Sequence, residues 1–188
     1  MQNLNNKFEI VNMQPNNTTS VLLVRGGECV IFDPWGRAAD WIKLLDDRGL
    51  KLAGIYATHG HPDHISAAPD LAKHYNIDWH MSHLDMGLLK WGNGLLEYFG
   101  LPIINDDFKQ PTDLTDGTHA VINGVDMHVI SVPGHTPGGY GNVVPRRRGD
   151  FGGRYTVPGQ LWSHRFARRE YRRFIQIYSQ NLRNEFAR

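Results

Sequence analysis

Three histidines and an aspartate fall within six residues of this chain, in the segment His-Gly-His-Pro-Asp-His at residues 59–64. The apolar run Leu-Ala-Gly-Ile-Tyr-Ala-Thr, residues 52–58, comes directly before it and predicts a strand that ends at the histidines. Residues two apart at the end of a strand project to the same side. His59 and His61 can therefore bind one metal ion from a single short segment.

The second half of this segment supplies a carboxylate and another imidazole. Pro62 bends the chain, so Asp63 and His64 can face a second ion beside the first. Imidazole and carboxylate together suit zinc, and iron or manganese are also possible. The alternative is a polar loop whose histidines only contact water, and the density of ligand side chains disfavours it.

A further histidine, His135, lies in the glycine-rich segment Gly-His-Thr-Pro-Gly-Gly at residues 134–139. Two β-rich runs precede it within residues 117–132, and Asn123 with Gly124 joins them into a predicted hairpin. A single histidine is weak evidence for a metal site. A glycine-rich turn at the end of a hairpin strand nevertheless suits a third ligand that enters from a neighbouring loop.

The order of the predicted elements favours an α/β fold with stacked layers and loops at one edge. A chain of 188 residues with 40% hydrophobic content is expected to form one core. The chain opens as a small antiparallel sheet, and strands then alternate with helices. The predicted elements are strands at 8–11, 20–24 and 29–33, a helix at 38–49, a strand at 50–58, a helix at 65–75, a strand at 77–81 and a helical stretch at 84–99.

The two histidine segments resemble those of the metallo-β-lactamase superfamily, and the resemblance covers residues 8 to about 144. The family hallmark His-x-His-x-Asp-His is present as His-Gly-His-Pro-Asp-His, and the second family motif as Gly-His-Thr-Pro-Gly-Gly. Within the superfamily the chain is most similar to small bacterial hydrolases near glyoxalase II, which hydrolyse hydroxyacyl-glutathione thioesters. The resemblance implies an αββα sandwich whose C-terminal part is incomplete in this chain.

The resemblance also implies roles for individual residues. It assigns Asp63 and His64 to a second metal site. The implied reaction is hydrolysis of a thioester, such as a hydroxyacyl-glutathione, by a metal-bound hydroxide that Asp63 orients as the catalytic residue. Asp33 matches a family aspartate near the site, although capping a turn explains it equally well. The expected ligands of the first zinc ion are His59, His61 and His135.

The chain departs from the family pattern after residue 144. The family has a bridging aspartate in a Gly-Asp-Thr motif and a last histidine in a Pro-Gly-His-Gly turn, and neither motif occurs in this sequence. Residues 145–188 instead contain 11 arginines, no lysine and 3 acidic residues. Residues 1–144 contain 9 lysines and arginines against 16 acidic residues, so the basic charge is confined to the tail.

A shift of the reading frame explains both the arginines and the missing motifs. If each original codon joins the last two bases of one present codon to the first base of the next, Arg154 as CGA before Tyr155 yields the aspartate of Gly-Asp-Thr. We therefore expect a metallo-β-lactamase-like domain at 1–144 and a frame-shifted tail, not a domain, at 145–188. The shift comes from a genomic lesion or a sequencing error, and it implies impaired hydrolase activity.

The tail taken at face value leads to a different hypothesis. Residues 166–186 place apolar side chains at helical spacing among arginines, which is typical of a basic amphipathic helix that binds RNA or a membrane surface. This pattern favours a nucleic-acid-binding member or a nuclease of the same superfamily, and the frame shift disfavours it. A single-iron dioxygenase with the same ligands and a lactonase also stay open.

The expected partner is a small-molecule substrate, without a membrane partner and with nucleic acid disfavoured. Residues 84–112 are expected to contribute to substrate specificity, while the acyl group and the oligomeric state stay open. The chain shows no signal-peptide pattern and no apolar run of membrane-spanning length, so we expect a soluble cytoplasmic protein. Cys29, the only cysteine, excludes an internal disulfide and is expected in a buried strand. The histidines without ligand spacing are expected at the surface or hydrogen-bonded: His74, His80, His83, His119, His128 and His164.

Overall fold

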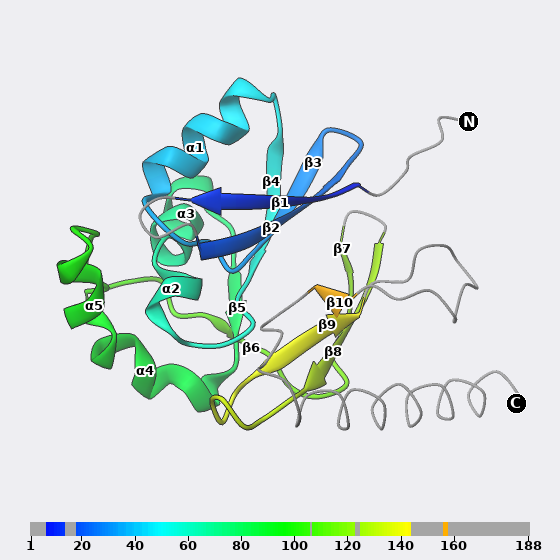
Figure 1. Ribbon diagram of the computed structural model, residues 1–188. Helices are drawn as coiled ribbons and strands as arrows, with labels where there is room; N and C mark the ends of the chain where they lie inside the picture. Colours follow the sequence, from blue (N-terminus) through cyan, green and yellow to red (C-terminus); the bar gives the residue numbers. More distant parts are fainter. Residues whose placement is uncertain (1–6, 14–17, 106, 123–124, 144–155, 158–188) are drawn as a thin grey trace, which may run out of the picture.

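The computed structural model describes residues 7–13, 18–105, 107–122, 125–143 and 156–157. Two sheets pack against each other, and helices cover the outer face of the first sheet (Figure 1). This arrangement confirms the predicted α/β sandwich. The expected incomplete C-terminal part, the frame-shifted tail and the basic helix at 166–186 lie outside the described residues, apart from the two residues of one short strand.

The first sheet has six strands in the order β1-β2-β3-β4-β5-β6. The strands β1, β2 and β3 pair antiparallel as predicted, and the pairs from β3 to β6 are parallel. The helices α1, Ala38–Asp47, and α3, Ala68–Tyr75, supply two of the parallel crossovers. The strand bounds are β1 Lys7–Met13, β2 Thr18–Arg25, β3 Glu28–Phe32, β4 Lys51–Tyr56, β5 Trp79–Met81 and β6 Thr112–Asp113.

The second sheet has the order β10-β9-β8-β7, and all of its pairs are antiparallel. Its strands are β7 His119–Ile122, β8 Val125–Ser131, β9 Tyr140–Val143 and β10 Thr156–Val157. The pairing of β7 with β8 confirms the predicted hairpin, whose turn residues lie outside the described part. The loop between β8 and β9 contains the glycine-rich segment 134–139.

The central strands of the first sheet are apolar on both faces, because each face has a layer to contact. Leu22, Ile31 and Ile55 belong to the core under the helices, which also contains Trp41. Their neighbours along the strands face the second sheet instead, as the period of two in a strand requires. The core between the two sheets consists of Val21, Leu23, Val30, Phe32, Tyr56, Leu114, Met127, Val129 and Tyr140.

The helical stretch expected at 84–99 is divided into three pieces. A 3-10 turn η1, His83–Asp85, leads into α4, Met86–Trp91, and α5, Asn93–Tyr98, follows after Gly92. A Cβ atom on Gly92 would lie 2.7 Å from Pro62 Cγ, so this junction packs directly against the first residue of α2, Pro62–Ile65. The expected helix at 65–75 is present as α3, which begins at Ala68, and α2 ends at Ile65 before it.

The structure also bears on the expectations for Cys29 and for membrane-spanning helices. Cys29 is buried in β3 as predicted, and burial, together with the nearby Glu28, raises the pKa of its thiol to about 12. Among the helices of the described part, none is both long and apolar enough to span a bilayer.

Candidate metal centre

The candidate site lies where the parallel strands of the first sheet end. Asp33 follows β3, Thr58 and His59 follow β4, and all three are buried. Carboxyl ends of parallel strands meet at one edge of a sheet, which is where open α/β folds bind ligands. The second sheet reaches the same edge, because the backbone N–H of Tyr140 in β9 donates to the carbonyl of Thr58 at 2.8 Å.

Three imidazoles converge at this edge. Ligand nitrogens of His59, His61 and His135 all lie within 4.8 Å of one another. His59 Nε2 and His61 Nδ1 lie 3.1 Å apart. Two ligands of a tetrahedral zinc at about 2.1 Å stand about 3.4 Å apart, so this spacing suits a shared metal ion. The structure therefore brings together the three residues that the sequence predicted as ligands of one ion.

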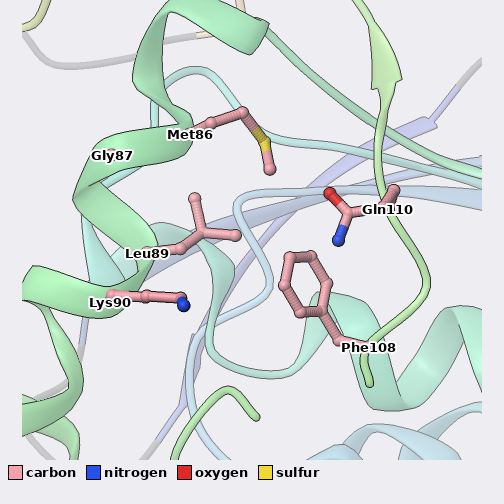
Figure 2. Close-up of a pocket in the computed structure, with 6 residues that line it drawn as sticks. All are labelled: Met86, Gly87, Leu89, Lys90, Phe108 and Gln110. Carbon is pink, nitrogen blue, oxygen red and sulfur yellow. The ribbon is translucent and has the colours of Figure 1, made fainter. Parts of the chain in front are cut away.

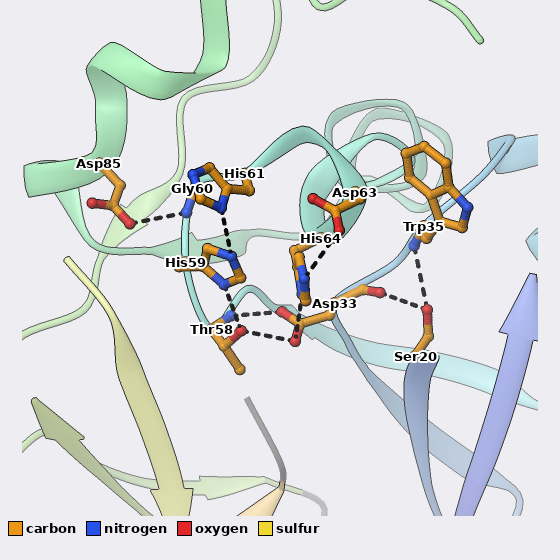
Figure 3. A network of polar contacts seen from close by, with 10 residues as sticks. All are labelled: Ser20, Asp33, Trp35, Thr58, His59, Gly60, His61, Asp63, His64 and Asp85. Atoms are coloured by element: carbon orange, nitrogen blue, oxygen red, sulfur yellow. Dashed lines mark hydrogen bonds and ion pairs between the residues drawn. The ribbon is translucent and has the colours of Figure 1, made fainter. Parts of the chain in front are cut away.

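A short chain of hydrogen bonds fixes the orientation of His59 (Figure 3). The hydroxyl of Thr58 donates to Asp33 Oδ2 at 2.8 Å, because a carboxylate can only accept. The same hydroxyl therefore accepts from His59 Nδ1, which lies 3.1 Å away. This tautomer leaves the lone pair on Nε2, the nitrogen that faces the other histidines, available for a metal.

Burial and repulsion from neighbouring imidazoles disfavour the charged forms of His59 and His135. Burial, with additional repulsion from His64, His61 and His135, lowers the pKa of His59 to about 2. Burial also lowers the pKa of His135, with smaller effects from His61 and His64. A neutral imidazole is the form that binds a metal, so protons compete weakly for His59.

Asp63 and His64 form a pair of different character beside the cluster. The His64 ring lies between two carboxylates, with Nδ1 3.0 Å from Asp33 Oδ2 and Nε2 3.4 Å from Asp63 Oδ2. Burial lowers the pKa of His64, but the two carboxylates raise it to about 10. Burial opposes ionisation of Asp63, while its hydrogen bond to His64 and the charge of His64 lower the pKa of this carboxyl overall. Within the described residues no third ligand joins this pair, so the second metal site stays a prediction.

Asp33 belongs to the site and does more than cap a turn. Its carboxylate accepts from the backbone N–H of Thr58 at 2.7 Å and contacts His64. Its backbone has a φ of 54°, in the left-handed region that few residues other than glycine, asparagine and aspartate adopt. The hydroxyl of Ser20 donates to the Asp33 carbonyl and accepts from the backbone N–H of Trp35, which holds this turn in place.

Two residues that border the site were not identified from the sequence. Asp85 is buried and contacts both histidine loops through its carboxylate. Trp91 is 74% exposed, and its ring centroid lies 6.5 Å from that of His61. Both residues lie in a stretch where the spacing of apolar residues predicts a helix. This spacing does not indicate which of its residues reach the metal site.

A separate hollow of about 240 Å3 lies between α4 and the segment at 108–110, as Figure 2 shows. It is smaller than the about 300–1,000 Å3 typical of small-molecule sites. It falls within the stretch 84–112 that was expected to influence specificity, but the three clustered histidines are not among its lining residues. These are Met86, Gly87, Leu89, Lys90, Phe108 and Gln110.

Three of the histidines that lack ligand spacing have other partners, as predicted. His80 stacks on Tyr56 with ring centroids 4.5 Å apart, and burial lowers the pKa of its imidazole. His83 Nε2 lies 2.9 Å from the carbonyl of Pro111, and the exposed His74 contacts the Tyr75 ring. The side chains of His119, His128 and His164 lie outside the described part.

Comparison with known proteins agrees with this geometry. The family model described as "Metallo-beta-lactamase superfamily" matches residues 13–181. Hydroxyacylglutathione hydrolase GloC of Haemophilus influenzae is 29% identical over 146 residues, which cover 77% of this chain and 69% of that protein. Of the solved structures, BLEG-1 B3 metallo-beta-lactamase has a TM-score of 0.64 and 28% identity, over 73% of this chain and 67% of that one. TTHA1623 in a di-iron-bound form has a TM-score of 0.61 and 25% identity, over 80% of this chain and 78% of that one.

Proposed function

This chain belongs to the metallo-β-lactamase superfamily, and we propose that it is a zinc-dependent hydrolase of a thioester such as a hydroxyacyl-glutathione. The observation that carries the proposal is the convergence of His59, His61 and His135 from two sheets to within 4.8 Å. The relative from Haemophilus influenzae, whose name is that of a hydroxyacylglutathione hydrolase, supports the substrate class.

The three histidines would hold the metal and leave a coordination position open. A bound zinc ion lowers the pKa of its water to about 7 and polarises a carbonyl, so it supplies a nucleophile at neutral pH. Thr58 and Asp33 keep His59 in the tautomer that presents Nε2 to the metal. The protein thereby orients this ligand before any substrate arrives.

Asp63 is the residue that we propose to orient the nucleophile. Its carboxyl is partly exposed and has a lowered pKa, so it is ionised at neutral pH and can accept a proton or a hydrogen bond. The contact with His64 fixes its direction. If a second ion binds to Asp63 and His64, the imidazole must first lose its proton, because a metal needs the same lone pair.

Trp91 is the residue that we propose to contact the apolar part of the substrate. Its exposed ring borders His61 from the α4 side. Gly92, which follows Trp91 and joins α4 to α5, packs directly against Pro62, and this contact restricts the position of the C-terminal end of α4. An aromatic face beside the reacting centre can bind an acyl chain or another flat apolar group.

Purified protein incubated with lactoyl-glutathione, a panel of β-lactams and a panel of lactones tests the proposed reaction. We expect turnover of the thioester above the other two classes, and its loss after chelation of the metal. Oxygen consumption, measured with an oxygen electrode, tests the single-iron dioxygenase. The nucleic-acid alternative predicts a tight affinity for RNA that falls steeply with salt. Turnover of lactones or β-lactams alone, or oxygen consumption, would contradict the thioesterase assignment.

The identity of the metal needs its own experiment, since the described TTHA1623 structure is a di-iron form. Metal-stripped protein is divided and reconstituted with zinc, ferrous iron or manganese, and activity and bound metal are measured for each. We expect the highest activity with zinc. Activity confined to the iron form would replace zinc in the proposal and leave the ligands unchanged.

A further inference from the structure

Asp85 carries a buried carboxylate between the two loops that supply the histidines. Its Oδ2 accepts from the backbone N–H of Gly60 at 2.9 Å, a bond drawn in Figure 3. Its Oδ1 accepts from the backbone N–H of Gly138 at 2.8 Å. Gly60 lies between the two histidines of the first loop, and Gly138 belongs to the loop of His135. One carboxylate therefore connects both halves of the metal centre.

The two glycines also pack directly against this residue. A Cβ atom on Gly60 would lie 2.8 Å from both Cβ and the carbonyl oxygen of Asp85. A Cβ atom on Gly138 would lie 2.8 Å from Asp85 Cγ and 2.7 Å from Ser82 Cβ. Neither glycine has a positive φ, so close contact and not backbone conformation explains why a side chain does not fit.

The turn that carries Asp85 is itself anchored to the first sheet. The backbone N–H of Asp85 donates to the carbonyl of Ser82 at 3.1 Å, and the Ser82 hydroxyl accepts from Leu84. The backbone N–H of His83 donates to Asp113 Oδ1, at 2.7 Å, in the strand β6. The carboxylate is thus placed by a short turn held between β5 and β6, and the two histidine loops are fastened to it.

We infer that Asp85 is a positioning residue for the metal centre, which holds the loop of His59 and His61 at the correct separation from the loop of His135. This inference rests on the proposed metal site. Hydrogen bonds to a carboxylate are stronger than those between neutral groups, and burial keeps water from replacing them. Groups that orient metal ligands without binding the metal themselves increase metal affinity by about 10–100-fold.

The test is the zinc dissociation constant of Asp85→Asn, measured by competition with a coloured chelator. Asparagine keeps the shape but offers one acceptor oxygen, so its NH2 group faces one of the two backbone N–H groups. We expect zinc binding about 10–100-fold weaker than in the wild type. The d–d absorption bands of the cobalt-substituted protein should also shift, because the geometry of the ligands changes. Loss of stability alone would leave these bands unchanged.

Two control variants separate positioning from folding. Asp78→Asn makes the same exchange at an exposed carboxylate whose partner is Lys109, at 2.9 Å. Leu45→Ala removes a buried side chain of α1, far along the chain from the site, and should cost about 2–5 kcal/mol of stability. Both should bind zinc like the wild type. Equal zinc affinity in Asp85→Asn and wild type, or an equal loss in either control, would overturn the inference.

A pair of glycine variants keeps the test decisive if Asp85→Asn fails to fold. Gly138→Ala leaves the carboxylate in place but pushes the second loop away from it, whereas Gly141→Ala meets nothing within 4 Å. Weaker zinc binding in Gly138→Ala alone supports the inference, and equal binding in both variants overturns it.

If the wild type binds no zinc, the proposed function is wrong. Faster amide exchange at Gly60 and Gly138 in metal-free Asp85→Asn would then still show that Asp85 holds the loops, and unchanged exchange would refute this as well.

Discussion

The Nδ1 atom of His64 lies 3.0 Å from Oδ2 of Asp33, and both side chains are buried. The same carboxylate oxygen accepts the hydroxyl of Thr58, which in turn sets the tautomer of His59. One aspartate therefore determines the charge of one site imidazole and the orientation of another. This double role gives two of the predictions below, one for pH and one for metal affinity.

His64 should make the metal-free protein less stable as the pH rises. The pKa of its imidazole is about 10 in the folded protein and about 6.5 in an unfolded chain. Its contribution to stability is therefore complete below about pH 6.5 and is lost as the pH rises toward 10, by at most about 1.4 kcal/mol per pH unit. Urea unfolding between about pH 7 and pH 9 measures this slope. His64→Gln should flatten it and His74→Gln should not; equal slopes in all three proteins would refute the prediction.

The double variant His59→Ala, His135→Ala should lose the bound metal. It removes two of the three converging imidazoles, and the remaining His61 cannot hold an ion alone. Elemental analysis of purified wild type should find at least one ion per chain, and the variant close to none. His74→Ala, which removes an exposed histidine of α3, is the control and should keep the wild-type content. The same metal content in wild type and double variant would rule out the assigned ligands.

Thr58→Val should weaken zinc binding by about 10–100-fold without unfolding the protein. Valine has a similar shape but cannot accept from His59 Nδ1, so the ring is free to adopt the other tautomer. Calorimetric titration of the metal-free protein with zinc measures the change. Thr19→Val removes an exposed hydroxyl bonded to Asn12 and should have no effect. A wild-type affinity in Thr58→Val would show that this bond does not orient the ligand.

Trp91→Ala should raise KM about tenfold and leave zinc affinity unchanged. The indole borders His61 but is not a ligand, so its loss removes substrate contacts worth about 1–2 kcal/mol. Steady-state kinetics on a series of thioesters with acyl groups of increasing size measure the effect, which should grow with apolar size. Tyr98→Ala removes another exposed aromatic side chain, 82% exposed on α5, and serves as the control. Similar KM changes in both variants would contradict a specific role for Trp91.

The coding DNA tests the origin of the tail at 145–188, which lies outside the described residues apart from Thr156 and Val157. We expect a one-base insertion or loss between the codons of Val144 and Arg147, and an Arg154 codon that ends in GA, either CGA or AGA, because only these before a tyrosine codon yield aspartate. The restored frame should continue to a Pro-Gly-His-Gly turn, and protein made from it should bind two metal ions. An Arg154 codon that does not end in GA would refute the frame shift and favour a genuine basic tail.

The site residues that could be predicted from the sequence are those that lie in a recognisable local motif. His59 and His61 are two residues apart at the end of one predicted strand, so their common side could be predicted, and the glycine-rich turn after a hairpin strand marked His135 as a further ligand. The hairpin of β7 and β8 was predictable for the same reason, since its turn residues are local. Asp33 stayed ambiguous, because a local pattern cannot separate a turn cap from a contact with Thr58.

The residues that the sequence missed depend on contacts between distant segments. The bonds of Asp85 reach residues 25 and 53 positions away, and its own segment shows only a helical period. The division between α4 and α5 has a similar cause, because Gly92 packs on Pro62, the first residue of α2. The spacing of apolar residues predicts which face of a helix or strand is buried. It does not predict which other segment of the chain packs against that face.

The clustered histidines come from loops of different sheets, so a metal ion bound to them would influence which part of the protein unfolds first. A metal held by His59 and His135 would act as a cross-link between the two layers, tying the β8–β9 loop to the end of β4. An ion that binds only the folded chain at 100 times its dissociation constant adds about 2.7 kcal/mol to stability. A chelator would then act as a selective denaturant, which loosens the interface around Tyr56, Met127 and Val129 before it reaches the core beneath α1 and α3.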